Sequence, residues 1–79
     1  MKNNTKLTLL EIEQIREAAK EYAEDYIGAT RHIVLEEIDT QCDGYDFTVV
    51  CVIYLQNGST QGHVLGIRHA DNGFEVPLD

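Results

Sequence analysis

Apolar residues recur at helical spacing near the start of the chain. They lie within about a third of the circumference of a helix with about 100° per residue, at Ile12, Ile15, Ala19, Tyr22, Ala23 and Tyr26. Thr8 and Glu11 have the spacing of a capping box, in which each side chain accepts a hydrogen bond from the backbone of the other. Gly28 suits a left-handed C-cap. The pattern therefore predicts an amphipathic helix over residues 9–27.

After Gly28 the pattern changes to the alternation with a period of two that is typical of strands. It predicts strands at about 32–41, 45–56, 59–69 and 74–76, and the interruption at Glu36-Glu37 indicates a β-bulge. Turn signals separate the strands, at Asp43-Gly44, Asn57-Gly58 and Asp71-Asn72-Gly73. Pro77 ends the last strand because proline has no backbone N–H for the ladder. We therefore expect an antiparallel β-meander.

A two-residue turn at Asn57-Gly58 predicts a register for the central hairpin. Gln56 would then pair with Ser59, and Ile53, Cys51 and Val49 would lie opposite Gly62, Val64 and Gly66. On this face the glycines would leave a trough for the helix. The other face would carry an apolar set that a single helix cannot also cover: Ile33, Leu35, Val50, Val52, Tyr54, Leu65 and Ile67, with His63 among them. We therefore expect Val50, Val52, Tyr54, Leu65 and Ile67 to form an interface.

The expected fold class is α+β, with one N-terminal helix packed on a three- to four-stranded antiparallel sheet. We expect a single domain over residues 1–79, with residues 1–7 as a flexible N-terminus. This order of elements resembles the cystatin-like arrangement. The resemblance is one of architecture only, so it implies no function.

The charge balance restricts the classes of partner. Of the 79 residues, 14 are acidic and six are basic, so the net charge is −8. Nucleic acids and anionic membranes attract the opposite charge, and we expect the chain to bind neither. A larger protein with a basic surface is the expected partner. The chain has no 18-residue apolar run, no apparent signal peptide and only two cysteines, without CxxC spacing, which favours a cytoplasmic location.

The exposed side of the predicted helix carries the candidate binding residues. Four carboxylates follow one another at i, i+4 spacing, and Glu24 lies beside them; the full set is Glu13, Glu17, Glu21, Glu24 and Asp25. Successive carboxylates would be separated by about 6 Å along the axis, close to the phosphate repeat of a nucleic-acid strand. The column therefore suits imitation of a nucleic-acid backbone. The alternative is a helix face that only confers solubility, with Arg16 and Lys20 at its margin.

The residues that most often carry catalysis or bind metals are scattered. His63 and His69 would lie about 20 Å apart on one strand, and His32 belongs to another segment. Cys42 stands beside Asp43, which disfavours a reactive thiolate, and Cys51 suits a core position. Asp46 suits a cross-strand pair with His69. We therefore expect no enzyme, no metal site and no cofactor.

These observations favour a small protein-binding module. In size and acidity the chain resembles phage-type inhibitors of host defence, including anti-CRISPR proteins, and also toxin-neutralising immunity proteins. The resemblance implies stoichiometric inhibition of a basic, nucleic-acid-handling protein, with the acidic column in its groove. Alternatives are a homodimer or assembly subunit joined through the apolar sheet face, and a carrier of a small ligand between helix and sheet.

Overall fold

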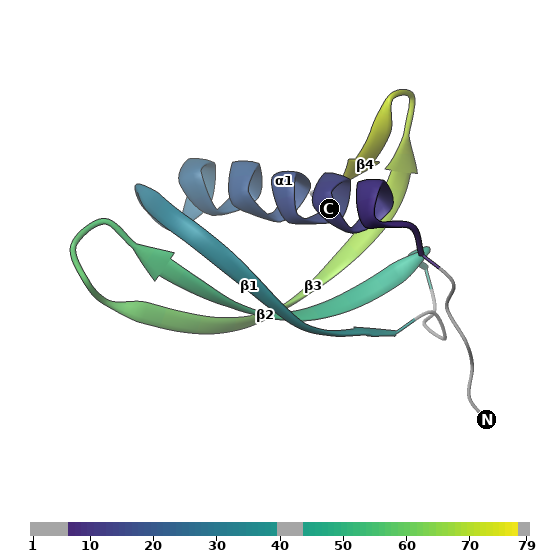
Figure 1. Cartoon of the computed structure of the whole chain (residues 1–79). Helices are drawn as coiled ribbons and strands as arrows, with labels where there is room; N and C mark the ends of the chain where they lie inside the picture. The colour runs from purple at the N-terminus through teal and green to yellow at the C-terminus, as the bar shows by residue number, and fades with distance from the viewer. Residues whose placement is uncertain (1–6, 40–43, 78–79) are drawn as a thin grey trace.

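The computed structural model describes residues 7–39 and 44–77. It contains helix α1 (Leu9–Tyr26) and strands β1 (Thr30–Asp39), β2 (Phe47–Leu55), β3 (Thr60–Ala70) and β4 (Gly73–Glu75). The strands form one antiparallel sheet in the order β1-β2-β3-β4. The sheet curls around α1, which lies along its concave face (Figure 1). The predicted α+β arrangement is confirmed. The predicted Asp43-Gly44 turn includes Asp43, which lies outside the described residues.

The start of α1 has the predicted capping box. The backbone N–H of Glu11 donates to Thr8 Oγ1 over 3.1 Å, and the backbone N–H of Thr8 donates to Glu11 Oε1 over 2.9 Å. Leu7 is half-buried and packs against the core, although we had expected it to belong to a flexible N-terminus. Local side-chain chemistry thus determines where the helix begins.

The end of α1 differs from the prediction. The N–H groups of Ile27 and Gly28 both donate to the carbonyl oxygen of Ala23, over 2.8 and 2.9 Å. Ile27 keeps a helical conformation, and Gly28 has a φ of 156°. Gly28 therefore ends the helix, but without adopting the left-handed helical conformation of a typical C-cap.

The register of β1 against β2 confirms the predicted bulge. Leu35 pairs with Cys51, and the next pair joins Glu37 to Val50, so Glu36 is the extra residue. A second irregularity lies between Thr30 and His32. The placement of Ile33 and Leu35 on the face away from the helix is wrong, since both residues pair with core residues of β2 and pack in the core.

The predicted register of the β2–β3 hairpin is wrong by one residue. Val50 pairs with Val64, and Val52 pairs with Gly62. The loop has three residues, Gln56 to Gly58, because Leu55 N–H donates to the Ser59 carbonyl over 2.9 Å. Gly58, with a φ of 92°, takes the left-handed position that such a loop requires. A shift of one residue exchanges the two faces of a strand.

The exchange of faces changes the composition of the core. Leu65 and Ile67 lie on the concave face with Val49, Cys51 and Ile53, and all five are buried. Gly62 and Gly66 lie on the outer face, so the predicted glycine trough beneath the helix does not exist. Small residues of α1 allow its close approach to the sheet instead, namely the buried Ala18, Ala19 and Ala23.

Candidate functional site

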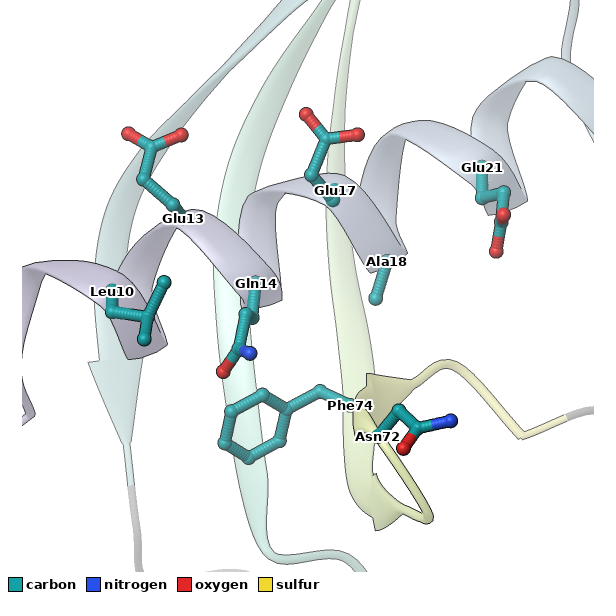
Figure 2. Close-up of a pocket in the computed structure, with 8 residues that line it drawn as sticks. All are labelled: Leu10, Glu13, Gln14, Glu17, Ala18, Glu21, Asn72 and Phe74. Atoms are coloured by element: carbon teal, nitrogen blue, oxygen red, sulfur yellow. The ribbon is translucent and has the colours of Figure 1, made fainter.

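The acidic face of α1 is the first candidate site. Its five predicted residues, Glu13, Glu17, Glu21, Glu24 and Asp25, are all exposed, and Glu21 and Asp25 lie on the flank of the helix toward β4. Figure 2 shows the carboxylates of Glu13 and Glu17 directed away from the β3–β4 hairpin, whereas Gln14 points toward Phe74. The structure therefore brings the predicted acidic residues together on one surface.

Few cations neutralise this face. Arg16 pairs with Glu13 and lies on the flank of α1 toward β1, beside Glu36 and Glu37. In the described part of the chain, Glu17, Glu21, Glu24 and Asp25 take part in no ion pair. Apart from Glu13, the carboxylates of this helix therefore repel one another with no ion pair to a described cation.

The β4 side of the helix adds a carboxylate that the sequence analysis missed. Glu21, Asp25 and Glu75 line a depression of about 190 Å³, together with Tyr22 and Tyr26. Glu75 lies on β4, and its distance from α1 depends on how the β3–β4 hairpin folds beside the helix. No local pattern in the sequence predicts that Glu75 lies beside α1.

Tyr22 and Tyr26 belong only partly to the core. Their ring centroids are 5.2 Å apart; Tyr22 packs against the core, whereas Tyr26 is 58% exposed. Both tyrosines belong to the predicted apolar face of the helix, but Tyr26, in the last turn, is exposed. An exposed tyrosine beside carboxylates offers both apolar contact and attraction for a cationic side chain.

A second depression lies between α1 and the β3–β4 hairpin. It has a volume of about 350 Å³ and places Leu10 and Phe74 beside Glu13 and Glu17 (Figure 2). Leu10 is 68% exposed, so an apolar side chain accompanies the acidic column. The face therefore has a mixed apolar and acidic character, which is typical of protein interfaces.

The second candidate, the outer face of the sheet, does not have the predicted composition. Val50, Val52 and Tyr54 lie there, but Leu65 and Ile67 are in the core. The corrected register adds Val34 and Val64, which are 40% and 65% exposed. The outer face, defined here by Val34, Val50, Val52, Tyr54 and Val64, keeps its apolar character. His32 stacks on Tyr54, with ring centroids 4.4 Å apart.

The predicted pair of Asp46 and His69 is present. Asp46 Oδ2 accepts hydrogen bonds from the backbone N–H of His69 over 2.7 Å and lies 2.8 Å from His69 Nδ1. These bonds lower the pKa of Asp46, the backbone bond most strongly. The imidazole also contacts Phe47 and Phe74, with centroids 6.0 and 4.8 Å away. The pair fixes the end of the β2–β3 ladder.

The histidines and Cys51 have separate neighbours in the described part of the chain. His63 bonds to Gln61, and within residues 7–39 and 44–77 no three His, Cys, Asp or Glu side chains are close enough to hold a metal. Cys51 is a buried free thiol whose pKa is raised by burial. Cys42 lies outside the described residues.

Comparison of the chain with protein-family models, with curated proteins and with solved structures gives no match. The described part of the chain contains no helix long and apolar enough to cross a membrane. The assignment of function therefore depends on the surface of the molecule.

Proposed function

We propose that the protein is a small, non-catalytic binding module that inhibits a basic, nucleic-acid-handling protein by placing α1 in its nucleic-acid groove. The observation that supports this proposal is the exposed column of Glu17, Glu21 and Asp25, which form no ion pair with any residue that the structure describes. Its acidic side chains repeat about every 6 Å, and a groove that binds phosphates attracts such a column. Such a target implies action in the cytoplasm.

The mechanism is competition. The target's lysine and arginine side chains would bind the carboxylates of α1 in place of phosphates, and Tyr26 and Leu10 would add apolar contact at either end of the helix. Opposite charge speeds the encounter, so association should be fast and should weaken as salt screens the charges. A phage-type inhibitor of host defence and an immunity protein against a nuclease toxin would both act in this way.

The test is a comparison of two charge-reversed variants. Glu17→Lys with Glu21→Lys changes the acidic face, and Glu36→Lys with Glu37→Lys makes the same change in net charge on β1. All four positions are exposed. The protein is used to capture partners from nuclease-treated lysate, and the affinity of a purified, captured nucleic-acid-binding protein is then measured. We expect the first variant to lose about tenfold in affinity, or about 1.4 kcal/mol, and the second to lose little.

Three results would contradict the proposal. Unchanged affinity of the α1 variant would exclude the acidic face as the contact. Equal losses in both variants would show that net charge alone attracts the partner. A captured protein whose activity on nucleic acid is unaffected by the wild-type chain would also contradict the competition mechanism.

A further inference from the structure

The outer edge of β3 lacks a complete strand partner. β4 pairs with β3 only from Arg68 to Ala70. From Thr60 to Ile67 the far side of β3 therefore has no neighbouring strand in the part of the chain that the structure describes. Figure 1 shows the β3–β4 hairpin turning up beside α1, away from the start of β3.

The backbone groups on this edge follow from the register. Leu55 N–H donates to the Ser59 carbonyl, and hydrogen-bonded residues alternate along an antiparallel ladder. The odd-numbered residues of β3 thus bond to β2, and the even-numbered residues direct N–H and C=O outward. These are Thr60, Gly62, Val64 and Gly66. No hydrogen bond to another described residue occupies these groups.

The other edge of the sheet is protected, and this one is not. β1 has irregularities at two points and carries Arg31, Glu36, Glu37 and Asp39. Bulges and charges of this kind prevent a strand from pairing with another chain. Between Thr60 and Ile67, β3 has a regular register and no Asp, Glu, Lys or Arg. The contrast marks β3 as the edge that is able to accept a strand.

We infer that this edge pairs, antiparallel, with the same edge of a second copy of the chain. No acidic residue lies between Phe47 and Ala70, so this is where two molecules of net charge −8 approach each other with least repulsion. A basic partner is attracted to α1 instead. The exposed Val64 on the same segment gains apolar contact from the second copy.

One register uses all four outward-facing residues. Thr60 pairs with Gly66 of the second copy, and Gly62 pairs with Val64 of the second copy. The two-fold symmetry repeats both pairs with the copies exchanged. The pairing ends before Arg68, where β4 already occupies the edge. A two-fold axis then passes between the His63 residues of the two copies. The dimer has a continuous sheet with both α1 helices on one side of it.

Sedimentation equilibrium provides the first test. We expect the wild type to have twice the 8.9 kDa mass of one chain. Val64→Pro removes an outward N–H but no bond to β2, so this variant should be a folded monomer by circular dichroism. Val64→Lys should also be monomeric and serves if the proline variant does not fold. Val34→Lys places the same charge on the outer face at β1 and should remain dimeric.

Cross-linking tests the register. In a Cys42→Ser, Cys51→Ala background, which removes the thiol directly opposite position 63 on β2, His63→Cys should form an intermolecular disulfide, because residues on the two-fold axis of a non-hydrogen-bonded pair have Cα atoms about 4.5 Å apart. Gln61→Cys is the control, since its Cα atoms would lie about 13 Å apart along the strands. A monomeric wild type, a dimeric Val64→Pro variant, a monomeric Val34→Lys variant or a cross-link at Gln61 alone would each overturn the inference. The acidic-face proposal does not depend on these results.

Discussion

Gly66 has no room for a side chain, because the ring of Tyr45 packs against it. A Cβ at Gly66 would lie 2.5 Å from Cδ1 of Tyr45 and 2.7 Å from its Cγ. The whole ring would have to move, and Arg68, whose guanidinium lies 5.5 Å from the ring centroid, would lose its contact. At Gly62, also on the outer face, a Cβ would meet nothing within 4 Å. The two glycines thus differ in their surroundings.

Gly66→Ala should therefore destabilise the fold by about 1–3 kcal/mol, the usual cost of overpacking. Gly62→Ala should leave the stability unchanged or slightly raised, since alanine restricts the unfolded chain. Urea unfolding of both variants measures the difference. Equal stabilities would mean that Tyr45 moves away without cost.

Cys51 should be unreactive in the folded protein. Its side chain is fully buried, and burial raises the pKa of its thiol, so little of the nucleophilic thiolate forms near neutral pH. In a Cys42→Ser variant we expect a thiol reagent to modify Cys51 at the rate of global unfolding in buffer, and rapidly in denaturant. Rapid modification in buffer, with the fold intact by circular dichroism, would contradict the buried position.

Asp46 should contribute to the pH dependence of stability. Its pKa is lowered in the folded state, so its stabilising contribution is full above the unfolded value of about 3.9. That contribution is lost as the pH falls through the lower, folded value. Asp46→Asn should therefore lose less thermal stability than the wild type between about pH 5 and pH 2, a range that begins above the unfolded value and extends in the direction of the shift. Parallel melting temperatures over this range would show that the carboxylate is not held by His69.

At the scale of elements, the start of α1 depends on one side chain. Thr8→Ala removes the acceptor for the Glu11 N–H and should cost about 1 kcal/mol of stability. Thr8→Ser keeps the hydroxyl and should restore most of the loss. Chemical denaturation of the three proteins measures this. A serine variant as unstable as the alanine variant would mean that the methyl group of Thr8, and not its hydroxyl, stabilises the helix.

The same contrast between local and distant chemistry explains how much of the fold was predictable. The capping box and the bulge at Glu36 depend on residues within three positions of each other in the sequence, and both were predicted. The β2–β3 register depends on the loop. A two-residue type I′ turn requires a positive φ at Asn57 as well as at Gly58. In the described residues only glycines have positive φ, so Asn57 instead belongs to a longer loop.

The backbone conformation of Asn57 thus determines which parts of the candidate sites were predictable from the sequence. The exposure of the five acidic residues of α1 follows from helical spacing alone. The outer face depends on the register, so Leu65 and Ile67 were assigned to it in error and Val64 was missed. Glu75 joins the acidic surface through the tertiary packing of β4 beside α1, which no periodicity encodes.

At the scale of the whole molecule, the acidic face has a cost in stability. Glu13, Glu17, Glu21 and Asp25 form three like-charged i, i+4 pairs, each destabilising by about 0.2–0.5 kcal/mol. A face that served only solubility would function equally well with alternating charges, which stabilise a helix. The repulsion along α1 is therefore expected where binding, and not stability, determines the sequence.

This cost is measurable without knowledge of the partner. Sodium chloride screens the repulsion, so the melting temperature of the wild type should rise between low salt and about 0.5 M, where the Debye length is only a few ångströms. Glu17→Lys with Glu21→Lys converts two of the three repulsive pairs, 13–17 and 21–25, into attractive ones and leaves the middle pair like-charged. This variant should be more stable than the wild type at low salt, by about 1 kcal/mol, and should gain less from added salt. Glu36→Lys with Glu37→Lys makes the net charge less negative by the same amount. It is therefore the control that distinguishes repulsion within the acidic column from repulsion due to the charge of the whole molecule. If both variants gain the same stability over the wild type, the repulsion arises from the net charge of the whole molecule and not from the carboxylates of α1. A larger gain for the α1 variant, combined with weaker partner binding, would show that the same carboxylates destabilise the free protein and stabilise its complex.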